Sequence, residues 1–137
     1  MQRLVSAWVW TCWVLIVLVT FPLVTVVFAA TAPFDPGRYH AGRLFRWMGA
    51  LGARLNPWWR FETRGRYPRD PRHPYVAVSN HESYADIFLI SYLPWEMKWL
   101  AKKTIFNIPV MGWMMRMAGD VPLVRGNRQS AVGALAR

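Results

Sequence analysis

The sequence predicts an α/β domain that follows an N-terminal membrane helix and a basic amphipathic helix. Three observations support this prediction. Residues 4–34 carry no charged side chain, whereas the chain from residue 38 onward is rich in arginine and tryptophan. Farther on, short apolar runs alternate with stretches of helical periodicity, as in domains where strands and helices alternate. A length of 137 residues allows one domain at most.

The apolar run at residues 4–30 is long enough to cross a bilayer, because a spanning helix needs about 20 apolar residues. Pro22 predicts at most a kink, since membrane helices tolerate proline. The small residues at 30–32 resemble the cleavage site of a signal peptide. However, the run is longer than the roughly 7–15 apolar residues of such a peptide. We therefore predict a retained anchor that spans the bilayer or enters one leaflet, rather than a cleaved signal.

The placement of arginine predicts the orientation of this anchor. Arg3 alone precedes the apolar run, and the next five arginines all follow it, namely Arg38, Arg43, Arg46, Arg54 and Arg60. The positive-inside tendency therefore places the remainder of the chain in the cytoplasm, on the inner membrane. Cys12 is the single cysteine and has no disulfide partner within the chain, which fits a reducing compartment.

Residues 38–56 predict an amphipathic helix. Its apolar positions recur at helical spacing, with the arginines elsewhere on the helical wheel; they are Leu44, Met48, Leu51 and Leu55. Such a helix lies in the plane of a membrane interface or packs on its own domain. Next to an anchor, the net charge of +10 favours contact with anionic lipid headgroups. Nucleic acid is not predicted as a partner, because no helix-turn-helix, zinc-finger or RNP pattern occurs.

Short apolar runs and breaker residues predict the remaining elements. Strands are expected at 61–66, 75–79, 98–101 and 121–124, helices at 84–93 and 110–118, and a turn or short helix at 104–108. Gly119 should end the helix at 110–118, and Pro122 should keep its strand at an edge or a strand start. Asn127 is the predicted N-cap of a final helix. The chain then divides into an anchor (1–34), a basic juxtamembrane segment (35–66) and an α/β part (67–137).

An imidazole and a carboxylate, His81 and Asp86, lie five residues apart after the predicted strand at 75–79. Ligand sites of α/β domains form at the carboxyl ends of strands. A histidine held by an acidic partner takes a proton from a hydroxyl near neutral pH. The alternative is structural, because Ser83 and Asp86 also have the spacing of a helix capping box. No metal site is predicted, since His40 and His73 lack ligand-like spacing with His81.

Residues 80–86 read Asn-His-Glu-Ser-Tyr-Ala-Asp and resemble the first signature block, N-H-x-S-x-x-D, of the glycerolipid acyltransferases. The resemblance is strongest to the 1-acyl-glycerol-3-phosphate acyltransferases. Residues 98–113 and 119–127 are similar to the stretches that follow in that family, so that the resemblance covers residues 75–137 in order. The family's later blocks, a Glu-Gly-Thr-Arg sequence and a proline-containing strand, do not occur in the chain. The resemblance therefore implies an incomplete acyltransferase domain from a truncated or fragmentary chain.

This resemblance implies an acyl transfer at a membrane. His81 would act as the general base and Asp86 as its orienting partner. The acceptor would be 1-acyl-glycerol 3-phosphate (lysophosphatidic acid), the donor an acyl thioester of coenzyme A or acyl carrier protein, and the product phosphatidic acid. No metal or bound cofactor is implied. One alternative keeps this chemistry with another lysophospholipid or an acylated amino-acid lipid as acceptor. Another is a catalytically incomplete, membrane-anchored remnant that binds anionic lipid.

The resemblance also suggests which residues bind substrate. Arg125 would hold the acceptor phosphate, because a guanidinium fork matches phosphate oxygens with paired hydrogen bonds. Lys102 and Lys103 are further candidates for that phosphate, and Asn80 and Ser83 would shape the loop. The alternatives without a binding role are a surface charge for Arg125 and a solvated loop for the lysines. Residues 121–126 depart from the family's usual second block, an isoleucine–phenylalanine strand before an Asp-Arg pair, which leaves the acceptor preference open.

Overall fold

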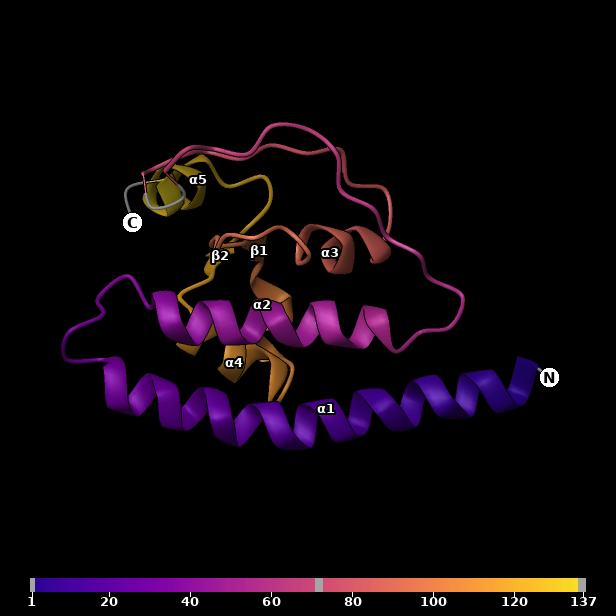
Figure 1. Ribbon diagram of the computed structural model, residues 1–137. Helices are drawn as coiled ribbons and strands as arrows, with labels where there is room; N and C mark the ends of the chain where they lie inside the picture. Colours follow the sequence, from indigo (N-terminus) through magenta and orange to yellow (C-terminus); the bar gives the residue numbers. More distant parts are fainter. Residues whose placement is uncertain (1, 71–72, 136–137) are drawn as a thin grey trace.

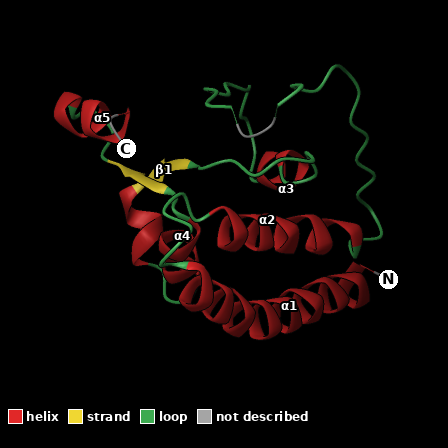
Figure 2. Ribbon diagram, turned by 60° about the vertical axis from the view of Figure 1, so that its left-hand side comes forward, coloured by secondary structure: helices red, strands yellow, loops and turns green. Residues whose placement is uncertain are grey.

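The computed structural model describes residues 2–70 and 73–135. Its elements in chain order are α1 (Gln2–Thr31), α2 (Tyr39–Arg54), α3 (Ala85–Ile90), β1 (Leu100–Lys102), the 3-10 helix η1 (Lys103–Asn107), α4 (Met111–Ala118), β2 (Val121–Leu123) and α5 (Arg128–Leu135). The helices α1 and α2 run antiparallel, and α3 lies on the other side of α2 from α1 (Figures 1 and 2). A helical hairpin thus carries a small α/β unit.

The predicted apolar helix forms as α1, which is 30 residues long. Its buried side chains make one narrow stripe at four-residue spacing, Cys12, Ile16, Thr20 and Val24. This stripe packs on α2 and α4. The opposite face is apolar but exposed, and Leu18 for example is 65% exposed. By length and composition α1 is suited to cross a membrane, with a mean hydropathy of 2.6.

The predicted amphipathic helix forms as α2 and packs within the chain, between α1 on one side and α3 and α4 on the other. Small residues allow this close packing: a Cβ at Gly52 would lie 2.3 Å from Cη2 of Trp13. The structure corrects the position of Arg46. The helical wheel grouped it with the polar arginines, yet it is buried. Its guanidinium pairs there with the carboxylate of Asp120, the residue directly before β2. The domain-packed alternative therefore describes α2.

The hydrophobic core lies where α1, α2 and α4 meet. Its buried members come from all three helices and from η1, and they include Val24, Phe45, Phe106 and Met114. The strands β1 and β2 pair in parallel beside this core, and η1 and α4 connect them. Gly119 ends α4 in the left-handed conformation with φ of 81°, as predicted for a stop residue.

Two predicted strands, at residues 61–66 and 75–79, are wrong. Both segments lack regular secondary structure, so the described sheet has two strands, β1 and β2, where four were predicted. Val76 and Val78 are 83% and 91% exposed. Strand propensity reports how well a side chain fits a half-buried sheet, and these side chains have no such surface to pack on. The predicted helix at 84–93 forms more briefly as α3, and tight turns continue it to Leu93, just before Pro94.

The final helix, α5, begins as predicted. The side-chain Oδ1 of Asn127 accepts the backbone N–H of Ser130 at 3.0 Å, which is the hydrogen bond of an N-cap. The hydroxyl of Ser130 accepts the backbone N–H of Val124 at 3.0 Å in turn. These two bonds fix the start of α5 to the end of β2.

Candidate active site

His81 and Asp86 meet at the start of α3. Asp86 lies in the first turn of this helix, and His81 lies in the loop that precedes it. The Nδ1 atom of His81 is 3.2 Å from Oδ2 of Asp86. A carboxylate accepts hydrogen bonds and cannot donate them, so Nδ1 of the neutral ring carries the proton. Nε2 is then left with a free lone pair, as a general base requires.

The same carboxylate also holds the loop. Oδ2 of Asp86 accepts the backbone N–H groups of Glu82 and Ser83, each at 2.8 Å. These two hydrogen bonds, from Ser83 and then Glu82, together with the contact to His81, lower the pKa of Asp86 below its usual 3.8 despite some opposing desolvation. Asp86 is therefore ionised at neutral pH.

Asp86 can orient His81 and cap a helix at the same time, so the catalytic and structural predictions for it are compatible. One half of the capping box forms, since Asp86 accepts the N–H of Ser83. The other half differs, because the Ser83 hydroxyl accepts the N–H of Ala85 at 3.0 Å. Asp86 therefore closes the turn at the start of α3 and holds the imidazole of His81 at the same time.

The pair is open to solvent. The side chain of His81 is 51% exposed and that of Asp86 is 27% exposed. Asn80 and Ser83 are also exposed in the same loop. Since the segment at 75–79 is not a strand, hydrogen bonds within the loop position His81, and a sheet edge does not.

The predicted phosphate ligands lie in a second cluster. Lys102 ends β1, Lys103 begins η1, and Arg125 follows β2, and all three residues are exposed. Lys102 pairs with Leu123 in the parallel sheet, so the lysines and Arg125 emerge at the same carboxyl end of the sheet. The helices α3 and α5 lie on opposite sides of this sheet (Figures 1 and 2). The three cations thus share one end of the sheet, whereas His81 and Asp86 lie at the start of α3.

A buried ion pair that the sequence analysis did not single out joins α2 to the sheet. The guanidinium of Arg46 pairs with the carboxylate of Asp120, and their side chains are 10% and 1% exposed. Oδ1 of Asp120 also accepts the N–H of Trp99 at 3.0 Å, and Nε of Arg46 donates to the carbonyl of Met97 at 3.3 Å. The available signal was a lone aspartate directly after the glycine stop of α4. This cluster fixes α2 against the segments that lead into both strands.

A second polar contact reinforces this connection. Nζ of Lys98 donates to Oε1 of Glu96 at 2.9 Å and to the carbonyls of Arg38 and Ala118 at 3.0 and 2.8 Å. Burial raises the pKa of Glu96 above its usual 4.5, and the hydrogen bond from Lys98 opposes that rise. The start of α2 and the end of α4 are thus held by one ammonium group.

Residues 60–137 match the family model described as "Acyltransferase". The chain belongs to the acyltransferase family. The matched region contains the His81–Asp86 pair, the two lysines and Arg125, whereas α1 and α2 precede it. Two helices outside the matched region therefore supply much of the core on which this acyltransferase family member is built.

Several curated acyltransferases are similar to this chain. The chloroplastic 1-acyl-sn-glycerol-3-phosphate acyltransferase BAT2 of Brassica napus is 47% identical over 64 residues, which cover 47% of this chain and 19% of the relative. The chloroplastic enzyme LPAT1 of Arabidopsis thaliana is 45% identical over 64 residues, covering 47% and 18%. The lyso-ornithine lipid O-acyltransferase of Pseudomonas aeruginosa is 31% identical over 87 residues, covering 58% and 33%.

The match to these acyltransferases is partial on their side. This chain spans about a fifth of the length of the first curated relatives it matches. No solved structure matches the chain. Membership of the family therefore rests on the matched region at residues 60–137.

Proposed function

We propose that this chain takes part in the transfer of an acyl group from a thioester to the free hydroxyl of 1-acyl-glycerol 3-phosphate. The observation that carries the proposal is the His81–Asp86 pair, 3.2 Å apart, inside the region matched by the family. The relatives named 1-acyl-sn-glycerol-3-phosphate acyltransferases support the choice of acceptor. The donor is an acyl thioester of coenzyme A or acyl carrier protein.

In the proposed reaction, Nε2 of His81 takes the proton of the acceptor hydroxyl while the oxygen attacks the thioester carbonyl. The tetrahedral intermediate then collapses, the C–S bond breaks, and the thiol leaves with the proton from the imidazolium. Asp86 keeps Nδ1 protonated and stabilises the positive ring between these two steps. The products are phosphatidic acid and the free thiol.

We assign the acceptor phosphate to Arg125, Lys102 and Lys103. Their common position at the carboxyl end of the sheet supports this assignment. A guanidinium binds two phosphate oxygens at once, and ammonium groups add charge beside it. Asn80 and Ser83 shape the loop; the N–H and hydroxyl of Ser83 both form hydrogen bonds within it.

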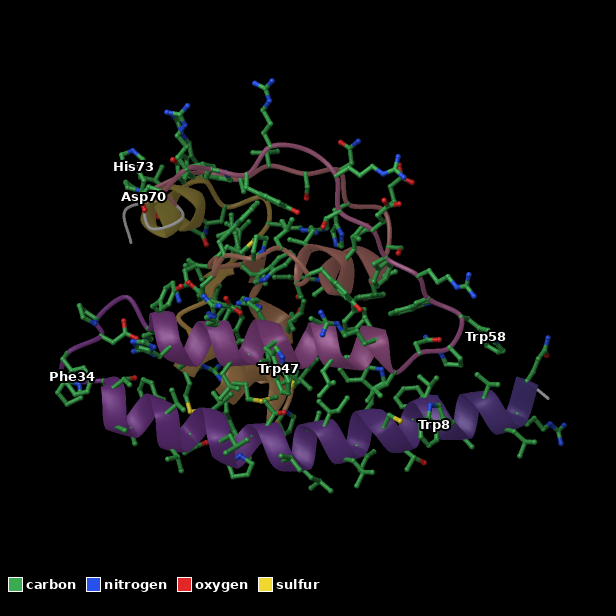
Figure 3. The ribbon with its side chains drawn as sticks, viewed as in Figure 1. Trp8, Phe34, Trp47, Trp58, Asp70 and His73 are labelled. Atoms are coloured by element: carbon green, nitrogen blue, oxygen red, sulfur yellow. The ribbon has the colours of Figure 1, made fainter. Side chains whose placement is uncertain are left out.

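The proposed location is the cytoplasmic surface of the inner membrane. One stripe of α1 is buried on α2 and α4, so its exposed apolar face is the part available to lipid. Trp8 and Trp58 lie at one end of the α1–α2 hairpin and Phe34 at the other (Figure 3). Tryptophan is favoured at the level of lipid headgroups. An enzyme held there meets an acceptor and an acyl tail that both prefer the bilayer.

A second acceptor is supported by two observations. The lyso-ornithine lipid O-acyltransferase aligns with 58% of this chain, more than the 47% aligned with the two plant enzymes. The segment at 121–126, which carries Arg125, also departs from the usual second block of the phosphate-acceptor enzymes. The chemistry at His81 is the same for this lipid, and only the headgroup contact differs.

The test is acyl transfer by membranes that carry this chain, with both acceptors offered beside a labelled thioester. We expect His81→Ala to lower turnover at least about hundredfold, the usual minimum for a general base. His73→Ala, at another exposed histidine, is the matched control and should keep wild-type turnover. Equal turnover in the wild type and His81→Ala would rule out the base role. Transfer to lyso-ornithine lipid alone would favour the second acceptor, and no transfer in any variant would favour a lipid-binding remnant.

A further inference from the structure

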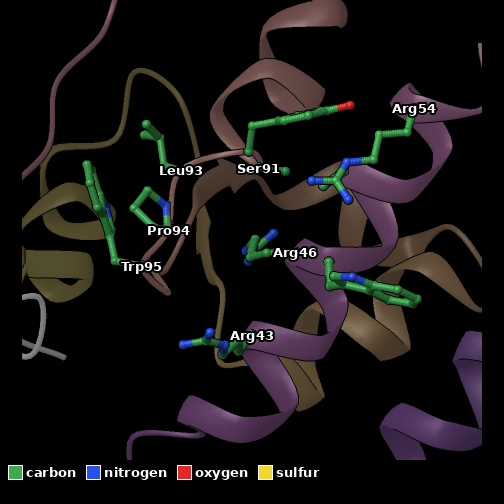
Figure 4. A pocket seen from close by; sticks show the side chains of 10 residues that line it. Arg43, Arg46, Arg54, Ser91, Leu93, Pro94 and Trp95 are labelled. Carbon is green, nitrogen blue, oxygen red and sulfur yellow. The ribbon is translucent and has the colours of Figure 1, made fainter. Parts of the chain in front are cut away.

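A basic pocket lies between α2 and the segment that follows α3, and neither His81 nor Asp86 lines it (Figure 4). Its volume is about 290 Å³. Three arginines and three aromatic residues dominate its lining: Arg43, Arg46, Arg54, Trp47, Tyr92 and Trp95. No carboxylate is found among the described residues that line it. The pocket is therefore suited to an anion.

The three arginines differ in how far their charge is neutralised. Arg46 is buried and paired with Asp120, so its charge is neutralised. Arg43 donates to the hydroxyl of Tyr39 at 3.0 Å. The guanidinium of Arg54 lies over the ring of Tyr92, 5.4 Å from its centroid. Neither a hydroxyl nor a ring neutralises a cation, so Arg43 and Arg54 leave two positive charges at the pocket.

These two arginines act on the same space. They lie 11 residues apart, about three helical turns, and so occupy one face of α2. Figure 4 shows both guanidinium groups pointing toward the side of the pocket formed by Leu93, Pro94 and Trp95. Between them, Arg46, Trp47 and the small residue Ala50 also line the pocket.

The lining has the chemistry that would suit a phosphorylated nucleotide. Guanidinium groups bind phosphate with paired hydrogen bonds, and aromatic side chains stack on nucleobases. The pocket lies on the side of α2 that faces α3, whereas α1 lies on the opposite side (Figure 2). With the outer face of α1 in lipid, the pocket opens on the aqueous side. A water-soluble ligand fits this position better than a lipid headgroup.

We propose that this pocket binds the phosphorylated nucleotide end of a coenzyme A thioester, an inference that rests on the proposed function. Ser91, in the pocket wall, follows Asp86 by five residues, or about 8 Å of helix. A coenzyme A thioester carries its phosphates and its reactive carbonyl at opposite ends of a flexible arm. Anchoring the phosphates at Arg43 and Arg54 therefore leaves the carbonyl free to reach His81, and it favours coenzyme A over acyl carrier protein as donor.

The experiment is a titration of the purified full chain in detergent with coenzyme A, dephospho-coenzyme A and pantetheine, followed by tryptophan emission and equilibrium dialysis. The double variant Arg43→Gln/Arg54→Gln should bind coenzyme A at least tenfold more weakly than the wild type. The control Arg66→Gln/Arg69→Gln makes the same charge change at exposed sites outside the pocket and should bind normally. Pantetheine, which lacks phosphate, should bind weakly to all three proteins. Near-ultraviolet circular dichroism checks that each variant is folded.

Unchanged coenzyme A binding in the pocket variant, or an equal loss in the control, overturns the proposal. Loss of binding to phosphatidylglycerol vesicles with normal coenzyme A binding assigns the arginines to lipid phosphate and also overturns it. The outcome is separable from that of the proposed function, because His81 does not line the pocket. Pocket-dependent coenzyme A binding without any acyl transfer would refute the function and support the pocket. Transfer that requires His81 but not Arg43 and Arg54 would do the reverse.

Discussion

Asp86 holds His81 and the loop around it through a single carboxylate oxygen. Oδ2 lies 3.2 Å from Nδ1 of His81 and 2.8 Å from the backbone nitrogens of Glu82 and Ser83. The orientation of the imidazole and the shape of the loop therefore depend on the same atom. This is why a five-residue spacing suffices to build the pair without a strand before it.

The first prediction concerns the charge of Asp86. Asp86→Asn keeps an oxygen acceptor but removes the charge, and it should lower kcat/KM for acyl transfer by about tenfold to hundredfold, the value of a charged hydrogen bond. Because the pKa of Asp86 is lowered in the folded state, the contribution of its charge to the rate is fully present above pH 3.8. This contribution is lost only as pH falls through the lowered folded-state pKa. The ratio of the two rates should therefore be constant between pH 5 and 8, and rates of both proteins over this range test this. Matching rates would leave Asp86 with a structural role alone.

The second prediction concerns the buried pair of Arg46 and Asp120. Asp120→Ala leaves a buried guanidinium without its partner, which typically costs about 3–5 kcal/mol of unfolding free energy. Glu62→Ala is the matched control, because the Glu62–Arg64 pair has side chains 69% and 82% exposed and should contribute about 1 kcal/mol or less. Denaturant unfolding in detergent measures both changes. Similar losses in the two variants would contradict the role assigned to burial.

The third prediction compares one substitution at two helical glycines. A Cβ at Gly112 would lie 2.1 Å from the backbone oxygen of Phe106, which cannot move aside as a side chain can. Gly112→Ala should therefore destabilise the fold by about 1–3 kcal/mol. Gly133 has nothing within 4 Å of its Cβ position, so Gly133→Ala should be neutral or stabilise α5 by up to about 1 kcal/mol. Thermal unfolding midpoints distinguish the two, and a stable Gly112→Ala protein would argue against this contact between α4 and η1.

The fourth prediction is a pH dependence of stability at Glu96. Burial raises its pKa in the folded state, so its contribution is fully present below pH 4.5 and is lost as pH rises through the raised value. Glu96→Gln removes the titrating group while keeping an oxygen that accepts from Lys98. Thermal midpoints should therefore fall less with rising pH in this variant than in the wild type. Parallel midpoint curves above pH 4.5 would mean that Glu96 is not desolvated in the folded chain.

The fifth prediction concerns the two faces of α1. Leu18 is 65% exposed and Ile16 is 7% exposed. Leu18→Lys should weaken membrane association at least tenfold and leave the fold intact, since a lysine in the apolar layer costs about 2.5–3.5 kcal/mol. Ile16→Lys should destabilise the fold itself, because it places a charge among α1, α2 and α4. Flotation with liposomes and circular dichroism separate these effects, and flotation of Leu18→Lys at the wild-type level would exclude this face from the membrane contact.

The sequence by itself determined the features that depend on near neighbours in the chain. A long apolar run predicted α1, helical periodicity predicted α2, and breaker residues predicted α4, all close to their observed bounds. Asn127 and Gly119 were identified as a helix start and a helix stop. The His81–Asp86 pair was predictable for the same reason, because residues within one turn of a helix start meet through local hydrogen bonds.

Only the tertiary structure decided what depends on distant partners. The runs at 61–66 and 75–79 have strand-forming residues but no strand beside them, and a strand exists only through hydrogen bonds to a neighbour. The sequence placed Arg46 on the polar side of its helix, but in the structure it is buried, because it pairs with Asp120, 74 residues away. The arginine pocket likewise forms only when the segment after α3 packs on α2. The spacing of residues in the sequence determines hydrogen bonds between near neighbours. Burial and pairing depend on which distant segments pack together in the folded chain.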